Sequence, residues 1–256
     1  MKEFAIQQYT FRPWAQKDGL FPVLEQISAM GYKGLEMCCF GGFEALKMSA
    51  AELKTRLADL GMHLIGNHFT RDSFLGSHDE AFAYIAEAGG SYAIYNIWGS
   101  YDREADVQEK ADYLNALSAI AQKQGITLLY HNHAEEFARL NGKLVIDDLM
   151  EALDPQICFE HDIYFSSLKG CNVYDYLRTH NQRIRTVHLK QIDAEGENVD
   201  LEDGILDISE VIYCAPNATD YILEQSSFSK SIPHSLQRNA AYLKKLYPQL
   251  GLTKSK

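Results

Sequence analysis

The residues best suited to chemistry in this sequence are histidines and acidic residues that end short apolar runs. Four runs in the second half of the chain end in Tyr130-His131-Asn132-His133, Glu160-His161-Asp162, His188-Leu189-Lys190 and Glu224-Gln225. A mixture of imidazole nitrogens and carboxylate oxygens suits Mn²⁺, Zn²⁺, Co²⁺, Fe²⁺ or Mg²⁺ better than a metal that prefers sulfur ligands. If the four runs converge in space, one divalent metal ion is the expected cofactor, and its identity stays open.

The spacing inside each run indicates which side chains share a face. Successive residues of a β-strand point to opposite sides of the sheet, so every second residue faces the same way. This rule pairs His131 with His133, Glu160 with Asp162, and His188 with Lys190. An unpaired polar group inside an otherwise apolar strand would cost a few kcal/mol, so His188 is expected to have a partner.

Eight apolar runs of this kind alternate with segments of helical periodicity along the chain. The runs begin near Phe4, Gly34, His63, Tyr92, Thr127, Ile157, Arg185 and Tyr221, at steps of 30, 29, 29, 35, 30, 28 and 36 residues. A repeat of roughly 30 residues is the length of one strand followed by one helix. Eight repeats fill the 256 residues, so the predicted fold of residues 1–256 is α/β, a (β/α)8 TIM barrel in a single domain. An open doubly wound sheet is the alternative.

Helix signals are clear in some of the repeats and weak in one. Leu20–Met30 carries an apolar stripe on one side, as expected for a helix that packs against a sheet. The longest predicted helix covers about Arg103–Gln124. In the seventh repeat Asp193–Asp203 is acidic and is predicted to be a loop, and only Ile208–Cys214 is predicted to be helical.

The composition restricts the partners of the protein. Lys and Arg total 24 against 35 Asp and Glu, for a formal net charge of −11. This charge repels phosphate backbones and anionic lipids, so neither nucleic acid nor a membrane is an expected partner. The start, Met1–Phe4, does not have the pattern of a signal peptide. The five cysteines form no C-x-x-C pair, which fits a reducing cytoplasm, and the oligomeric state stays open, a homo-oligomer included.

Polar and aromatic residues also end the first four runs. In a barrel of this type the catalytic groups lie at the carboxyl ends of the strands, so these residues would line the same mouth as the metal-binding runs. They are Gln7–Arg12, Glu36, Asn67-His68, and Asn96 with Trp98.

At these residues the sequence resembles the sugar phosphate isomerase/epimerase family of the xylose isomerase-like TIM barrel superfamily, which includes tagatose and psicose epimerases and inosose dehydratases. The resemblance extends over nearly the whole chain. It is carried by Gln8–Arg12, Gly31–Glu36, Tyr130–His133, Glu136-Phe137, Asp162, Val187–Lys190, Asp203–Asp207 and Glu224-Gln225.

The resemblance implies a metal held by an acidic residue on strand five, an Asp on strand six, a His on strand seven and a Glu on strand eight. The last three ligands carry over to Asp162, His188 and Glu224. Strand five departs from the family, because His131 stands where the epimerases have glutamate. His131 is therefore taken as the fourth ligand, with Glu136 as the second candidate. The loss of that glutamate puts the two-glutamate proton transfer of the sugar epimerases in doubt.

Such a site would bind a small carbohydrate. A divalent ion that chelates a carbonyl and its neighbouring hydroxyl acidifies the proton on carbon and stabilises the enediolate. His133 and Glu136 are the candidates for acid and base on one side and Glu224 on the other, and Lys190 would neutralise the developing oxyanion. Further contacts to the substrate are expected from Gln8, Tyr9, Arg12, Glu36, His68, Trp98 and Tyr164.

The predicted function is therefore a metal-dependent isomerase or epimerase of a small sugar or keto-sugar. A lyase or dehydratase acting on an inosose or a 3-keto-glycoside is the first alternative, because the two strand-five histidines suit proton abstraction near neutral pH. A barrel that binds sugars without catalysis is the second. An endonuclease acting on abasic DNA shares the broader superfamily, but the net charge of −11 opposes it.

Overall fold

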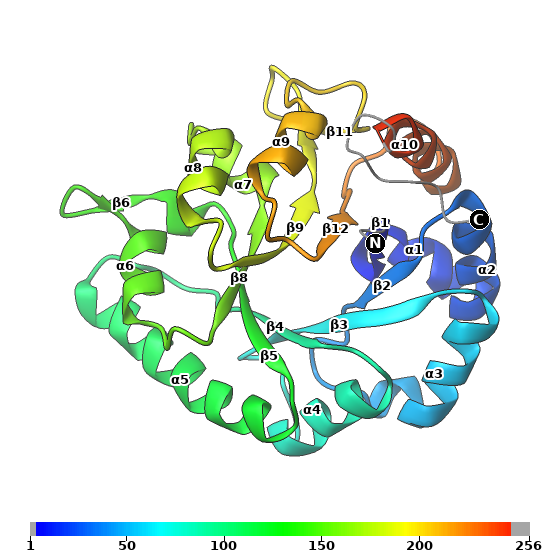
Figure 1. Ribbon diagram of the computed structural model, residues 1–256, viewed down its shortest axis with the longest axis horizontal. Coiled ribbons are helices and arrows are strands. Elements are labelled where there is room, and N and C mark those ends of the chain that lie inside the picture. Colours follow the sequence, from blue (N-terminus) through cyan, green and yellow to red (C-terminus); the bar gives the residue numbers. More distant parts are fainter. Residues whose placement is uncertain (1–3, 247–256) are drawn as a thin grey trace.

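The computed structural model describes residues 4–246. The domain is predicted to cover residues 1–256, so its two ends, 1–3 and 247–256, lie outside the described residues. Eight parallel strands close into a barrel that helices surround, as Figure 1 shows. The strands are β1 (Phe4–Gln7), β2 (Gly34–Met37), β3 (His63–Thr70), β4 (Tyr92–Asn96), β5 (Thr127–His131), β8 (Cys158–Asp162), β9 (Ile184–Leu189) and β12 (Asp220–Leu223). Because β1 pairs with both β2 and β12, the predicted TIM barrel is confirmed and the open sheet is wrong.

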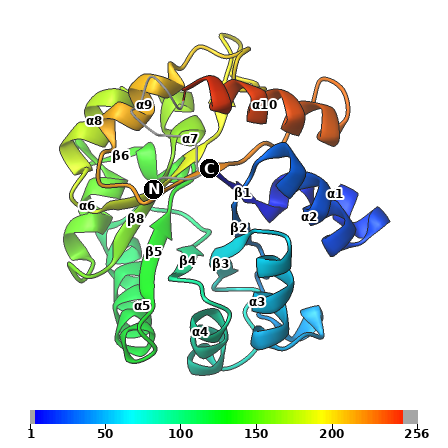
Figure 2. The same ribbon diagram turned by 45° about the vertical axis from the view of Figure 1, so that its right-hand side comes forward.

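Helices cover the outside of the barrel, and Figure 2 shows them ringed around the central strands. They are α1 (Gln8–Asp18), α2 (Leu20–Met30), α3 (Ala50–Asp59), α4 (His78–Glu87), α5 (Glu104–Lys123), α6 (Val145–Ala152), α7 (Ile163–Leu168), α8 (Val173–His180), α9 (Ile208–Cys214) and α10 (Ile232–Leu246), with short 3₁₀ turns η1 (Glu44–Leu46) and η2 (Glu135–Phe137). The predicted helix Leu20–Met30 is confirmed, and the one at Arg103–Gln124 is α5 with those two residues as its caps. Within residues 4–246, no helix has the length and apolar character needed to cross a membrane.

Two segments differ from the sequence prediction. The first run was expected to continue through Gln7–Arg12, but β1 ends at Gln7, whose side chain accepts a hydrogen bond from Tyr9 N at 2.5 Å and caps α1. The predicted loop Asp193–Asp203 contains a strand, β11 (Asn198–Val199), which pairs antiparallel with β10 (Gln191–Ile192). A second small hairpin joins β6 (Arg139–Leu140) to β7 (Lys143–Leu144).

The barrel wall separates two kinds of apolar packing. Outward-facing side chains join the helices in one large core, which includes Leu35, Phe69, Tyr130 and Leu189. Inside the barrel, two small clusters fill the lower part, where the strands begin. Their members are Ala5, Ile65 and Ile222 in one and Ile94, Leu129 and Cys158 in the other, with Tyr92 packed against both.

The strand pairing is irregular at two places in the barrel. Between β2 and β3 the register shifts just before Glu36, which lies opposite Gly66. Between β8 and β9 it shifts just before Glu160, which lies opposite Thr186. A side chain at Gly66 would bring its Cβ within 2.3 Å of Tyr92 O, so this position requires glycine. Such irregularities bend a strand and re-aim the side chains beside them.

Candidate functional site

Inward-facing side chains change from apolar to charged toward the carboxyl end of each strand. On β5, Leu129 belongs to the lower apolar cluster and His131, two residues further, belongs to a buried polar group. On β8, Cys158 is followed at the same spacing by Glu160 and then by Asp162. The period of two along a strand thus carries polar groups from several strands to the upper part of the barrel.

The four residues taken as metal ligands lie together at this level. One potential ligand atom from each of His131, Asp162, His188 and Glu224 lies within 4.8 Å of the others. They come from β5, β8, β9 and the residue after β12, and none is more than 8% exposed. We call these four residues the ligand group.

One atom of the ligand group is buried without a hydrogen-bond partner among the described residues. Asp162 Oδ1 accepts from Tyr164 N at 2.8 Å and caps α7, whereas Asp162 Oδ2 has no such partner and lies 3.9 Å from Lys190 Nζ. His188 Nδ1 lies 2.8 Å from Glu224 Oε2. Buried polar atoms rarely stay unpaired, and a shared cation would supply the missing interaction. Two imidazoles and two carboxylates form a donor set that fits Zn²⁺, Mn²⁺, Co²⁺ or Fe²⁺.

The charges around the ligand group shift its side chains in different directions. Burial would lower the pKa of His188, but Glu160 and Glu36 outweigh it and raise the pKa well above its usual range, so a metal ion would have to displace a proton from this ring. Burial raises the pKa of Asp162 to about 7, and a nearby cation would reverse that shift. Burial also acts to raise the pKa of Glu224, but the charges of Lys190 and His188 outweigh it and hold the pKa well below its usual range. Burial lowers the pKa of His131 to about 4, so its imidazole is neutral near pH 7, as metal binding requires.

A second buried group lies against the ligand group inside the barrel. It consists of Glu36 on β2, His68 on β3 and Glu160 on β8, and we call it the glutamate layer. His68 Nε2 lies 2.7 Å from Glu36 Oε1 and 2.8 Å from Glu160 Oε2. Sequence analysis expected Glu36 to contact substrate, but its side chain is fully buried and pairs with His68 and His188. Glu160 was not among the predicted site residues, although its shared face with Asp162 was a signal for it.

A cavity of about 490 Å³ opens above these groups at the barrel mouth. This volume is in the range of small-molecule sites. Residues expected at the site that line it are Tyr9, Arg12, His68, Trp98, His131, His133, Lys190 and Glu224. Gln7 and Asn96, which were expected at the mouth as strand-end residues, line it too. The lining residues that the sequence did not indicate are Phe40, Thr70, Ser73, Phe165 and Ser226.

Two of the lining residues that were predicted to be catalytic, His133 and Lys190, lie beside the ligand group. The ring of His133 packs between Trp98 and Phe165, with centroids 4.3 and 4.8 Å away. Burial lowers the pKa of His133 to about 2, so this imidazole is neutral near pH 7. Lys190 Nζ donates to Glu224 Oε1 at 2.7 Å. Burial would lower the pKa of Lys190, but the carboxylates of Glu224 and Asp162 outweigh it and raise the pKa.

Six predicted site residues lie outside the lining of this cavity. Asp162, His188 and Glu36 are fully buried in the groups already described, and the other three lie elsewhere. Gln8 Oε1 accepts from the backbone of Cys38 at 3.0 Å, because Gln8 begins α1 instead of continuing the strand. Tyr164 donates its hydroxyl to Gly196 O at 3.0 Å, and the neighbouring Phe165 lines the mouth. The third, Glu136, stands in a different network.

Glu136 is held by hydrogen bonds on both carboxylate oxygens. Its Oε1 accepts from the hydroxyls of Tyr130 and Tyr101 at 2.5 and 3.0 Å, and its Oε2 accepts from His133 N at 2.9 Å. It belongs to neither of the groups that could hold a metal ion. The contacts make Glu136 an anchor for the backbone of His133, with its carboxylate turned away from the ligand group.

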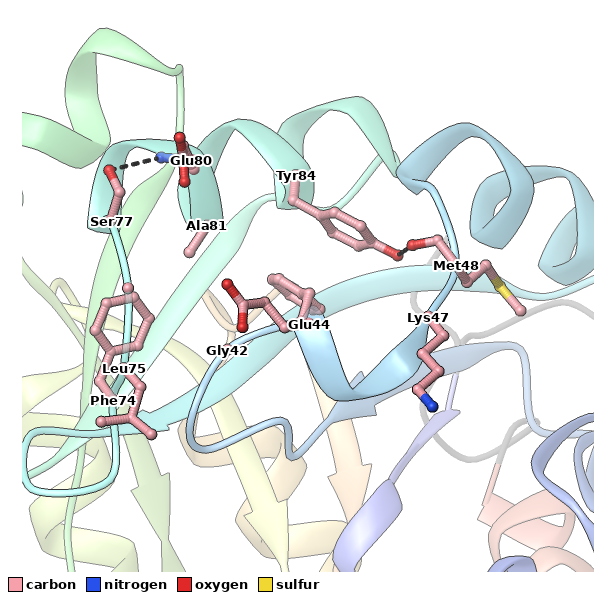
Figure 3. Close-up of a pocket in the computed structure, with 12 residues that line it drawn as sticks. Gly42, Glu44, Lys47, Met48, Phe74, Leu75, Ser77, Glu80, Ala81 and Tyr84 are labelled. Atoms are coloured by element: carbon pink, nitrogen blue, oxygen red, sulfur yellow. Dashed lines mark hydrogen bonds between the residues drawn. The ribbon is translucent and has the colours of Figure 1, made fainter.

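Two further cavities lie beside the mouth. One of about 320 Å³ is lined by Trp98, Tyr101, His133 and Glu136 among others. The other, about 300 Å³, lies between the segments that follow β2 and β3 and is shown in Figure 3. In the close-up, Phe74 and Leu75 lie on one side of it and Lys47 on the other. Neither contains a residue of the ligand group, so the barrel mouth is the candidate site.

Comparison with known proteins agrees with this choice of fold. Residues 24–245 match the family model described as xylose isomerase-like TIM barrel. An inosose dehydratase from Halalkalibacterium halodurans is 28% identical in an alignment of 195 residues that covers 68% of this chain and 62% of that protein. Another from Salmonella typhimurium is 26% identical in an alignment of 198 residues that covers 68% of this chain and 63% of that protein. The matched part is thus less than two thirds of these curated relatives.

Solved structures with low sequence identity share the same fold. A sugar phosphate isomerase/epimerase from Parabacteroides distasonis has a TM-score of 0.82 at 21% identity, covering 96% of this chain and 98% of its own. A 3-keto-D-glucoside 4-epimerase from E. coli has a TM-score of 0.74 at 15% identity, covering 96% of this chain and 100% of its own.

Proposed function

We propose that this chain, which belongs to the xylose isomerase-like TIM barrel family, is a divalent-metal-dependent isomerase or epimerase of a small sugar or keto-sugar. One observation carries the proposal. Four potential ligands from β5, β8, β9 and the residue after β12 lie within 4.8 Å of one another beside the mouth cavity, and the buried Oδ2 of Asp162 has no hydrogen-bond partner in the described chain. His131, Asp162, His188 and Glu224 would hold the ion.

The residues beside the ligand group would carry the proton transfers. A bound divalent ion would polarise the carbonyl and the adjacent hydroxyl of the substrate. The neutral imidazole of His133 would accept the proton from the carbon between them, and the ammonium of Lys190 would balance the negative oxygen of the enediolate. Return of that proton to the neighbouring carbon gives the isomer. For epimerisation, the ammonium of Lys190, which donates to Glu224, would deliver a proton to the opposite face, and His133 would release its proton to water.

A dehydratase is the second candidate, and a specific observation favours it. The matched relatives from Halalkalibacterium halodurans and Salmonella typhimurium are named inosose dehydratases. In addition, His131 stands where the two-glutamate epimerases have an acid, as the family resemblance implies. If a hydroxyl on the next carbon leaves once the enediolate has formed, the same proton abstraction by His133 ends in loss of water.

Metal content and isotope exchange together test both candidates. We expect about one ion per purified chain in the wild type and almost none in Asp162→Asn and His188→Ala. His63→Ala is the control, because His63 is exposed at the amino end of β3, and its metal content should be unchanged. Ketoses, inososes and 3-keto-glycosides are incubated with the protein and Mn²⁺ in deuterated water. Uptake of deuterium at carbon reports proton transfer, and loss of water from the substrate identifies a dehydratase. Wild-type metal content in both ligand variants would contradict the proposal.

A further inference from the structure

Each histidine of the ligand group is hydrogen-bonded to one glutamate of the glutamate layer. The Nδ1 of His131 lies 3.0 Å from Glu160 Oε2. The Nε2 of His188 lies 3.0 Å from Glu36 Oε1 and, at a longer 3.2 Å, from Glu160 Oε2. These bonds leave the opposite nitrogens, Nε2 of His131 and Nδ1 of His188, for the ligand group. The two rings therefore use different nitrogens toward their carboxylates.

The two glutamates are themselves held in place. The imidazole of His68 joins them through its Nε2, at 2.7 and 2.8 Å. Thr186 donates its hydroxyl to the other oxygen of Glu160 at 2.7 Å. Neither carboxylate can turn without losing a contact inside the barrel.

The backbone also serves this arrangement. Glu36 and Glu160 are the residues that directly follow the two register shifts in the barrel. A shift of this kind re-aims the next side chain, and here both re-aimed side chains meet a histidine of the ligand group. The hydrogen bonds and the register shifts are independent observations that point to the same two residues.

We propose that Glu160 and Glu36 are positioning residues that hold His131 and His188 in opposite tautomers for metal binding. His131 would carry its proton on Nδ1 and His188 on Nε2, each facing its carboxylate. A carboxylate behind a metal-bound imidazole fixes its tautomer and orientation and makes it a better donor to the ion. The inference rests on the proposed function in one respect, that these two histidines bind the ion.

A second metal ion in the glutamate layer is the competing interpretation. His68, His131, Glu160 and His188 also place ligand atoms within 4.8 Å of one another. A second ion there, with the first in the ligand group, would need both nitrogens of His131 and of His188 and would displace the protons that hold the two carboxylates. Imidazole nitrogens of His68, His131 and His188 lie 2.7–3.0 Å from carboxylate oxygens of the glutamate layer. These distances are ordinary hydrogen-bond lengths. We therefore expect one ion per chain.

Titration of the metal-free full-length chain with Mn²⁺ alone tests the inference. Glu160→Gln and Glu36→Gln keep the size of each side chain but remove its charge. Each should weaken Mn²⁺ binding about tenfold to hundredfold, the range seen when such supporting partners are lost. His161→Gln is the matched control, because His161 is equally buried on the same strand as Glu160 but bonds Ser166 on the opposite face. Its affinity should stay within about twofold of wild type.

A milder variant covers the case in which a glutamine variant does not fold. Thr186→Val keeps both carboxylates and removes one hydrogen bond to Glu160, so Mn²⁺ affinity should fall only about threefold to tenfold. Unchanged affinity in the folded variants would overturn the inference. Binding of two Mn²⁺ ions per wild-type chain would overturn it as well, because the glutamate layer would then be a metal site itself.

The tautomer of His131 gives a readout that needs no metal. Long-range proton–nitrogen correlation spectra of metal-free protein at pH 7 should show His131 protonated on Nδ1 and bare on Nε2. In Glu160→Gln this preference should be lost, and in His161→Gln it should persist. A wild-type His131 protonated on Nε2 would overturn the inference, whereas failure to bind Mn²⁺ with the expected tautomer would contradict only the proposed function.

Discussion

The lower and upper parts of the barrel interior are built on the same strands and differ completely in character. Below, Leu129 and Cys158 belong to a dry apolar cluster, and Ala5 and Ile222 to another. Two residues further along these strands stand His131, Glu160, Gln7 and Glu224. Side chains two residues apart on a strand point to the same side, so an advance of two residues leads from the apolar clusters to the polar site on the same inner face.

The two parts make opposite contributions to the protein. Burial of apolar groups stabilises a fold by roughly 0.8 kcal/mol for each CH₂, so the lower clusters support the barrel. Buried charges cost several kcal/mol each before pairing, and pairing often only offsets that cost. The upper part is thus expected to support activity while adding little stability, and the lower part to do the reverse. The following variants test this division, from the largest expected effect to the smallest.

The largest effect is expected in the upper part, at His133. His133→Asn should lower the rate of solvent deuterium uptake about 10²-fold to 10⁴-fold, the usual contribution of a general base. That range corresponds to about 3 to 5 kcal/mol of activation free energy. Metal content should not change, since His133 is not a member of the ligand group. Deuterium uptake at the wild-type rate would remove His133 from the mechanism.

The next effect is expected in the lower part, at Leu129. Leu129→Ala leaves a hole between Ile94 and Cys158 and should lower the free energy of unfolding in urea by about 3 kcal/mol. The folded variant should bind Mn²⁺ with wild-type affinity. A large loss of affinity in the folded protein would show that the two parts are not separable.

Metal binding links the two parts through stability. At a free Mn²⁺ concentration of 100 times Kd, the wild type should gain about 2.7 kcal/mol in the free energy of unfolding, and a chelator should remove the gain. His188→Ala should show no gain at the same concentration. An equal gain in that variant would mean that Mn²⁺ stabilises the chain from somewhere other than the ligand group.

The smallest effect is expected at the rim of the mouth. Trp98 is about half exposed, 51%, and lines the cavity. If its ring packs on the substrate, Trp98→Leu should raise KM about twofold to tenfold, the range of an aromatic contact worth 0.5 to 1.5 kcal/mol. The kcat and the metal content of this variant should equal those of the wild type. A fall in kcat with KM unchanged would assign Trp98 to the support of His133 instead.

The composition of the ligand group could be predicted because its signals are local. The eight repeats and their strand ends place His131, Asp162, His188 and Glu224 at the carboxyl ends of four strands, and the family resemblance selected them as candidates. The same local rule placed Glu160 beside Asp162. The pairing of Glu160 with His68 and His131 could not be predicted, because those residues lie on other strands and sequence spacing carries no information on distance across a barrel.

The misplaced residues show where local reasoning ends. Gln8 leaves the strand face because Gln7 caps α1, and Glu136 turns to two tyrosines because η2 folds back under His133. Both outcomes depend on how a connecting segment packs against its neighbours.

The sequence by itself determined the eight-fold alternation, the barrel, and which residues end each strand, because these follow from the period and the length of each repeat. Only the tertiary structure decided which polar groups meet. Closure of β1 on β12 brings Glu36 of β2 to His188 of β9, residues 152 positions apart in the chain. A contact of that kind exists only once the ring of strands is complete, since neither strand pairs with the other.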